Sequence, residues 1–296
     1  MRITFLGTGT SHGIPVIGCT CAVCLSPNPK NRRNRIGVWV HEGAQPEGRD
    51  LSQAGYEASS AKKGKTAGAG TVPAQDPRAE TSRPAGLSAV IDVSSEFRSA
   101  SLAFGLKRLD FVLLTHGHSD HVSGLDDLRI FSQTSGLPMP IYADARTLGE
   151  IRSRYAYAFA PPREYGGGTP QYELREVSGM FRQGDWRITP LPVMHGPEPI
   201  LGFRINDFAF ITDVTVIPES TLGLLGGLDI LVLDCLRKQP HSTHLSLDQA
   251  VAYARRIGAK RTYFIHLTHD LEHAETEAGL PENIRVAYDG LELETF

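Results

Sequence analysis

The sequence places four side chains of metal-binding type within six residues, namely His116, His118, Asp120 and His121. They follow the apolar run 109–114, which predicts a buried strand, so the cluster lies on the loop at the carboxyl end of that strand. Residues two apart in an extended loop point the same way, so His116 and His118 can bind one ion together. Asp120 and His121 fall on the following turn and can face a second position, while Gly117 allows a tight backbone path. We therefore predict a metal site.

Three later strands also end on side chains that bind metals. The residues at or just beyond these ends are His195, Asp213, His266 and His269. A single histidine at a strand end is usually a core or turn residue with ordinary hydrogen bonds. When several strands end in this way, the side chains are expected to meet at one site.

A second cluster consists of Cys19, Cys21 and Cys24. Three thiols this close cannot all pair with one another, and a C-x-C-x-x-C segment wraps well around one tetrahedral Zn²⁺. Such an ion needs a fourth ligand from elsewhere in the chain. The alternative is a redox-sensitive group, or three reduced thiols without a metal.

The hydrophobic pattern predicts an alternation of strands and helices. The predicted strands cover 2–6, 36–40, 87–93, 109–114, 140–143, 186–193, 200–205, 208–211, 228–233 and 261–265. The predicted helices cover 94–106, 124–132, 144–156 and 246–257. Ser94 or Ser95 is available as the N-cap of the first helix. Ser246 and Gln249 form a capping-box pattern before the last helix, which Gly258 ends.

Residues 42–86 contain almost no large apolar side chain and show no hydrophobic period. Such a segment cannot bury enough surface to offset its ordering entropy, so we predict a disordered insertion between two paired strands. Residues 160–168 contain two prolines and three consecutive glycines, which predicts a mobile loop or a lid over the site. The glycine loop 7–10 is either a tight turn or an anion-holding loop. The basic segment 30–35 is either a solvated turn or a contact for an anionic substrate.

The chain has 296 residues, and its formal charge of −3 argues against a surface that coats nucleic acid. No apolar stretch reaches the length of a membrane span, and the first residues lack a secretory signal pattern. Four cysteines with three close together do not suit a disulfide framework, which favours a reducing compartment. We predict a cytoplasmic protein without membrane contact. The oligomeric state stays open, a homodimer being the commonest oligomer.

Taken together, H-x-H-x-D-H at 116–121 followed by His195, Asp213 and His266 resembles the five-part signature of the metallo-β-lactamase superfamily. The resemblance spans residues 7–269. It implies an α/β (α+β) fold, the αββα sandwich, as a single domain over 1–296 with the insertion at 42–86. It also implies two divalent metal ions, Zn²⁺ or Mn²⁺, at one edge of the two sheets. The first ion would be held by His116, His118 and His195, and the second by Asp120, His121 and His266. Asp213 would bridge both ions.

Within that superfamily, the bridging aspartate resembles that of the hydrolases of phosphodiesters or thioesters. The thiol cluster and the spacing of His266 and His269 are similar to the phosphoribosyl cyclic phosphate phosphodiesterases of the carbon–phosphorus lyase pathway. This resemblance implies one structural Zn²⁺, held by the three cysteines and His269.

The sequence therefore predicts a binuclear metal-dependent hydrolase that acts on a small, including cyclic, phosphate ester. Water activated by the metals would attack phosphorus, and a histidine would protonate the leaving group as general acid. His244 is our first choice for that acid, because its distance from His266 along the sequence resembles that of the general-acid histidine in the phosphodiesterase relatives. His241 is the second choice. Asp234 would orient a ligand imidazole. The alternatives are a thioester hydrolase, a tRNA-processing nuclease of the same superfamily, or a non-catalytic zinc-stabilised binding protein. Replacing Asp120 by alanine would abolish turnover by an enzyme and spare a pure binding function.

Overall fold

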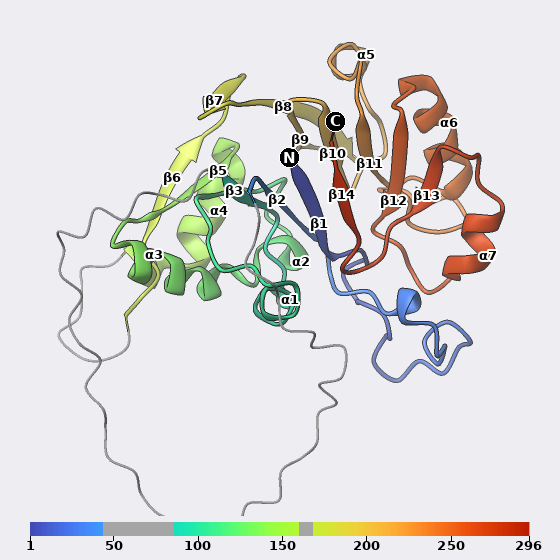
Figure 1. Cartoon of the computed structure of the whole chain (residues 1–296), viewed down its shortest axis with the longest axis horizontal. Coiled ribbons are helices and arrows are strands. Elements are labelled where there is room, and N and C mark those ends of the chain that lie inside the picture. The colour runs from blue at the N-terminus through green and yellow to red at the C-terminus, as the bar shows by residue number, and fades with distance from the viewer. Residues whose placement is uncertain (44–85, 160–167, 296) are drawn as a thin grey trace, which may run out of the picture.

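The computed structural model describes residues 1–43, 86–159 and 168–295. Two seven-stranded sheets lie in the middle of the molecule, with helices on either side of them (Figure 1). The insertion predicted over 42–86 and the loop predicted over 160–168 fall almost entirely outside the described residues, so disorder of the first and mobility of the second stay predictions.

The first sheet contains both ends of the chain. Its strands in spatial order are β14 (Glu292–Glu294), β1 (Arg2–Gly7), β2 (Gly37–His41), β3 (Ser88–Ile91), β4 (Phe111–Leu113), β5 (Met139–Ala143) and β6 (Tyr172–Glu176). β2 and β3, which flank the predicted insertion, pair as expected, and they run antiparallel. β3 to β6 run parallel to one another. In β2, β3 and β4 every residue is buried, because both faces of this part of the sheet are covered.

The second sheet is built from the later half of the chain. Its order is β13 (Ile284–Val286), β12 (Arg261–Ile265), β11 (Ile230–Asp234), β10 (Phe208–Ile211), β9 (Glu198–Ile205), β8 (Trp186–His195) and β7 (Phe181–Gln183). β10 to β13 run parallel, and β7 to β10 form an antiparallel meander.

Seven α-helices lie in the described residues. They are α1 (Phe97–Phe104), α2 (Ser119–Val122), α3 (Arg129–Ser135), α4 (Ala145–Arg154), α5 (Glu219–Leu222), α6 (Leu247–Ile257) and α7 (His273–Ala278). In Figure 1, α1 to α4 lie on one side of the strands and α6 and α7 on the other. Single 3₁₀ turns cover Pro29–Asn31, Leu125–Leu128 and Ala156–Phe159.

Three apolar clusters show that these elements form four layers. The central cluster contains Phe5 of the first sheet and Phe203 of the second, so the two sheets share one core. A second cluster packs Val112 of β4 against Phe97 of α1, and a third packs Leu231 of β11 against α6. This αββα arrangement is the one that the resemblance implied.

Most predicted elements are confirmed, with shifted ends. The capping box of Ser246 and Gln249 is present, and α6 ends at Gly258. The assignment of Ser94 or Ser95 as an N-cap was wrong. The N-cap position of α1 is Glu96, and the carbonyl of Ser94 accepts from the amide of Phe97 in a preceding turn. The helix predicted over 124–132 is instead a 3₁₀ turn followed by α3. The strands β6, β7, β13 and β14 were not predicted.

Parallel strands expose their carboxyl ends at one edge of a sheet. Asp92 and Thr115 lie beyond β3 and β4 there, and Asp213, Asp234 and His266 lie at or just beyond the ends of β10, β11 and β12. The topology therefore brings together the polar residues at the carboxyl ends of the parallel strands of both sheets.

Candidate metal centre

The H-x-H-x-D-H motif occupies the loop after β4 and the short helix α2. His116 lies in the loop, His118 holds the N-cap position, and Asp120 and His121 lie in the helix itself. The backbone changes from extended to helical at this point, so the last two side chains point in a different direction from the first two. The motif is therefore shaped to face two neighbouring positions, as predicted.

His116, His118 and His195 come together from both sheets. Nε2 of His116 lies 2.9 Å from Nδ1 of His118, and the ring centroids of His118 and His195 are 5.2 Å apart. One nitrogen of each ring and one oxygen of Asp213 lie within 4.8 Å of one another. The three histidines assigned from the resemblance to a first ion are thus neighbours in space.

Asp120, His121 and His266 form a second set beside the first. Oδ2 of Asp120 lies 3.5 Å from Nε2 of His121 and 3.6 Å from Nε2 of His266. Both imidazoles are buried. These are the residues assigned to the second ion.

Asp213 lies between the two sets. Its Oδ1 is 3.4 Å from Nε2 of His121 and 3.5 Å from Nε2 of His266. Its Oδ2 is 3.9 Å from Nε2 of His116, a member of the first set. Each oxygen of this buried carboxylate therefore faces a different set, which is the geometry that a bridging ligand requires.

Nε2 of His121 and Nε2 of His266 are buried and, among the described residues, have no hydrogen-bond partner. A buried polar atom without a partner costs about 1–3 kcal/mol. Imidazole nitrogens and carboxylate oxygens are the ligands that Zn²⁺, Mn²⁺ and Fe²⁺ accept. The residues present therefore fit divalent metal ions.

The charges of the cluster reinforce this fit. Burial disfavours a positive charge on His121, but Asp213, Asp92 and Asp120 outweigh it and raise the pKa of the imidazole well above its usual range. Burial likewise opposes protonation of His266, yet Asp213 and Asp120 raise its pKa to about 9. Several carboxylates are thus buried beside these rings, and a divalent cation would compensate their negative charge.

Polar groups behind the cluster hold the rings in place. Nδ1 of His121 lies 2.7 Å from Oδ2 of Asp92, and Nδ1 of His195 lies 2.8 Å from the carbonyl oxygen of Thr243. Asp234 accepts the amide of Asp213 and forms a hydrogen bond with Nδ1 of His244, and its Oδ1 lies 3.5 Å from Nδ1 of His266 without a hydrogen bond. Such partners fix the tautomer and orientation of metal-binding imidazoles. Asp234 lies beside the imidazole of His266, as expected, whereas Asp92 was missed because the predicted strand 87–93 included it, although β3 ends one residue before it.

Three of these residues have left-handed backbone conformations. The φ angles are 61° at Asp92, 55° at Asp213 and 63° at His266. Residues other than glycine adopt this region at a cost of about 1–3 kcal/mol, and such strain concentrates at functional sites. Here it turns each side chain sharply at the end of its strand.

His244 borders both sets of ligands. Its Nδ1 lies 3.3 Å from Oδ1 of Asp234 and its Nε2 lies 4.0 Å from Oδ2 of Asp213. Its ring stacks on that of His266, with centroids 4.8 Å apart. His241 lies farther out: its ring centroid is 5.2 Å from that of His244, and its Nδ1 accepts the amide of Thr243. His244 is therefore the better placed of the two candidate acids.

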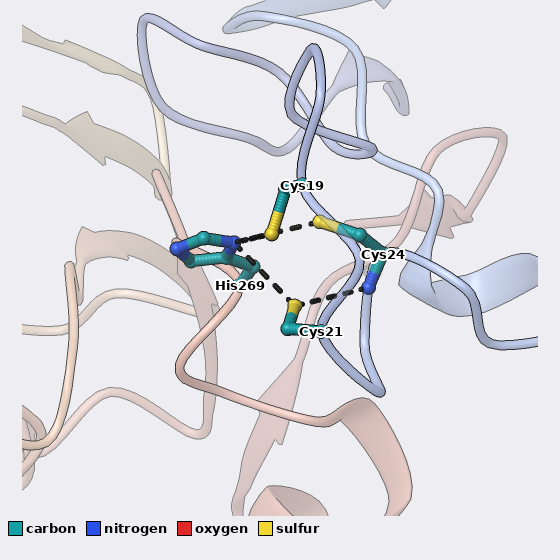
Figure 2. Close-up of side chains that lie close together, drawn as sticks. All are labelled: Cys19, Cys21, Cys24 and His269. Atoms are coloured by element: carbon teal, nitrogen blue, oxygen red, sulfur yellow. Dashed lines mark hydrogen bonds between the residues drawn. The ribbon is translucent and has the colours of Figure 1, made fainter.

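The three cysteines meet His269 at a second, separate site (Figure 2). Nδ1 of His269 lies 3.3, 3.6 and 3.4 Å from the sulfurs of Cys19, Cys21 and Cys24. The fourth partner predicted for the thiol cluster is thus in position, and three thiols with one imidazole suit a structural Zn²⁺. That this site holds zinc stays a prediction.

The glycine loop 7–10 and the basic segment 30–35 both contact distant parts of the chain. The amides of Thr8, Gly9 and Thr10 donate to Asp289, Asn34 and Leu267, so these three amides of the glycine loop are not left for an anion. The solvated turn predicted over 30–35 was wrong at its centre. Asn31 and Arg33 are each 1% exposed, because the segment passes beneath the chain that carries His269.

His273 and Asp270 are two further residues of metal-binding type near His269 in the sequence. Asp270 is exposed, whereas His273 is buried at the start of α7 and its Nε2 lies 3.6 Å from Oε2 of Glu277. Within the part of the chain that the structure describes, neither lies in a group of residues that could hold a metal.

Residues 88–267 match the family described as the Beta-lactamase superfamily domain. The chain belongs to the metallo-β-lactamase superfamily. With its ligand clusters, this membership makes it a metal-dependent hydrolase of that fold. Among the described residues, no helix combines the length and apolar character that a membrane span needs.

Known relatives of this superfamily member differ in their activities. It is 35% identical to a diphosphatase of the PhnP family, whose crystal structure aligns with a TM-score of 0.78 over 100% of this chain and 98% of that one. It is 33% identical, over 99% of its length, to an octanoyltransferase of Porphyromonas gingivalis, of which it covers 51%. The chain thus spans about half the length of that relative. It is 27% identical to a ribonuclease Z of Mycobacterium avium, over 61% of this chain and 75% of that protein.

Proposed function

We propose that this superfamily member is a binuclear metal-dependent phosphodiesterase that acts on a small, including cyclic, phosphate ester. The observation that carries the proposal is the position of Asp213, whose two oxygens face two different ligand sets. A carboxylate shared in this way holds two ions at the short separation that phosphoester hydrolases use. The 35% identity with a PhnP-family diphosphatase over the whole chain supports chemistry at phosphorus.

His116, His118 and His195 would hold one ion, Asp120, His121 and His266 the other, and Asp213 both. When bound, the two ions supply Lewis-acid chemistry, which withdraws charge from a phosphoryl group and eases deprotonation of water. The identity of the ions, Zn²⁺ or Mn²⁺, is set by availability as much as by these ligands.

The protein's own contribution to the reaction is a proton at the leaving group. Asp234 faces Nδ1 of His244, which leaves Nε2 directed at the ligand sets. From there Nε2 can hand a proton to the departing alkoxide, a contribution of about 10²–10⁴-fold. Asp120 is needed in this scheme as a ligand, so turnover requires it.

Two competing functions lie within the same superfamily. A tRNA-processing nuclease is favoured by the ribonuclease Z relative, whereas the formal charge of −3 argues against a docking surface for long nucleic acid. A thioester hydrolase would use the same metals. We also propose that the protein works in the cytoplasm on a small molecule, without nucleic-acid or membrane partners, and that any self-association is a homodimer.

The test is turnover by protein reconstituted with Mn²⁺ or Zn²⁺ on three substrates: a small cyclic phosphodiester, a precursor tRNA and an acyl thioester. We expect the cyclic phosphodiester to be hydrolysed with the highest kcat/KM and the Asp120→Ala variant to be inactive. Preferential cleavage of the tRNA or of the thioester would replace the proposal by one of the alternatives. Inactivity on all three with both metal sites filled would favour a binding protein.

A further inference from the structure

Arg33 is the most deeply buried cation of the segment that the sequence suggested as a solvated turn. Its side chain is among the largest that are fully buried, and burial lowers the pKa of its guanidinium to about 10. Among the described residues, no carboxylate lies within ion-pair distance of it. Burying a charge is costly, so its contacts must compensate.

Its two short hydrogen bonds go to backbone carbonyls on either side of His269, a longer one of 3.5 Å goes to Oδ1 of Asn31, and its Nε has no partner among the described residues. Nη1 of Arg33 donates to the carbonyl of Thr268 at 2.8 Å, and Nη2 donates to the carbonyl of Leu271 at 2.7 Å. The guanidinium therefore spans the turn 268–271 and fixes both of its ends. A planar fork with several donors can do this, whereas the single ammonium of lysine cannot hold the same geometry.

The same residue is joined to the cysteine loop through its backbone. The amide of Arg33 donates to the carbonyl of Ile14, and the amide of Ile14 donates back to Arg33, both at 2.8 Å. Ile14 packs in a small apolar cluster with Val23 and Cys24. Arg33 thus connects the loop that carries the three thiols with the turn that carries the imidazole.

The turn also continues directly into the active-site ligand His266. Only Leu267 and Thr268 separate His266 from His269, and the amides of these two residues donate to the carbonyls of Thr8 and Leu236. His266 itself has a strained φ of 63°. A strained residue keeps its conformation only where its surroundings hold it, so the contacts of the turn matter for the ligand.

We propose that Arg33 is a positioning residue that holds one turn in place for two metal sites, through His269 at the thiol cluster and through His266 at the candidate metal centre. The proposal rests on the metal-dependent function put forward above. It does not require that the substrate is a phosphodiester, because its first readout is metal binding.

The experiment compares Arg33→Met with Arg32→Met, which removes the same charge from an exposed neighbouring position. Cobalt titration of metal-free protein gives two readouts: thiolate-to-cobalt charge-transfer bands report the cysteine site, and bound cobalt in excess of that site, measured by metal analysis, reports the histidine and aspartate site. We expect Arg33→Met to weaken cobalt binding at the cysteine site about 10- to 100-fold, as loss of an orienting partner does. Arg32→Met is expected to match the parent protein.

A separate measurement compares the effects of each variant on kcat and on KM. If the turn holds His266, kcat of Arg33→Met falls and KM stays nearly constant, and filling the cysteine site with excess zinc restores only part of kcat. Unchanged cobalt affinity at the cysteine site would overturn the proposal. So would equal losses in Arg32→Met, since these would trace the effect to the charge of the segment.

Arg33→Lys keeps the assay informative if the methionine variant does not fold. It retains the cation and reaches at most one of the two carbonyls, so we expect weakened cobalt binding and altered charge-transfer bands. Full affinity with unaltered bands would refute the role of the two-carbonyl contact. A parent protein without phosphodiesterase activity would refute the proposed function and leave the cobalt result on Arg33 standing.

Discussion

Oδ1 of Asp213 lies 3.4 Å from Nε2 of His121, although the aspartate follows β10 of the second sheet and the histidine follows β4 of the first. The other oxygen of the same carboxylate faces His116 at 3.9 Å. One side chain thus connects both sheets and both ligand sets.

Asp213→Asn replaces the shared carboxylate by a neutral group of the same shape. We expect both ions to be held more weakly, with apparent metal affinity and turnover each reduced by at least about 100-fold, because the amide supplies one acceptor oxygen instead of two. Metal content after dialysis and initial rates measure the effect. Asp270→Asn, at an exposed aspartate, is the control. Retention of two ions per chain in Asp213→Asn would contradict the bridging role.

The loss of turnover in His244→Ala is expected to depend on the leaving group of the substrate. An alkoxide needs a proton to depart, so turnover of an alkyl phosphodiester falls by about 10²–10⁴-fold. A p-nitrophenolate leaves without help, so bis(p-nitrophenyl) phosphate is affected much less. The ratio of the two rates is the measurement, and His241→Ala is expected to leave it unchanged. If His241→Ala changes the ratio and His244→Ala does not, the two assignments are reversed.

Gly124→Ala tests how packing positions α2, which carries Asp120 and His121. A Cβ at Gly124 would lie 2.0 Å from the backbone oxygen of Ser94, so the chain must shift. Overpacking of this kind costs about 1–3 kcal/mol, and we expect a matching loss of unfolding free energy together with weaker metal binding. Gly149→Ala is the control, because open space surrounds that exposed helical position. It should stabilise α4 by about 0.5–1 kcal/mol. Equal stability of the two variants would show that α2 tolerates displacement.

His41 predicts a pH dependence of stability outside the metal centre. This buried ring stacks on Trp39 with centroids 3.9 Å apart, and burial lowers its pKa to about 4. In the unfolded chain its pKa is about 6.5. The folded protein therefore binds fewer protons between these values, and its stability is complete above pH 6.5 and declines toward pH 4.

The measurement is urea unfolding between pH 7 and pH 5 of the parent protein, His41→Phe and His12→Phe. The contribution of His41 amounts to about 1.4 kcal/mol per pH unit over the lower part of that range. We expect His41→Phe to lose part of the pH slope and His12→Phe, at an exposed histidine, to keep it. Identical slopes in all three proteins would show that His41 does not cause the loss.

The sequence determined the local features of this protein. Apolar runs such as 109–114 are buried strands because they fit the interior of a sheet covered on both faces, and Ser246 and Gln249 start a helix through contacts within one turn. The ligand types at 116–121 also belong to one short segment, so their spacing alone indicates their chemistry. The division of the ligands into a first set and a second set came from the family resemblance.

Only the tertiary structure decided which distant groups meet. His269 reaches Cys19 across 250 positions, and Asp92 reaches His121 because β3 lies beside β4 in the sheet. Arg33 is the clearest example of a contact that the sequence alone does not indicate. Its basic neighbours in the sequence suggest a side chain exposed to solvent. The side chain is instead buried and donates to two carbonyls of a turn more than 230 positions away. Such long-range contacts arise from the packing of the whole chain, and no local pattern records them.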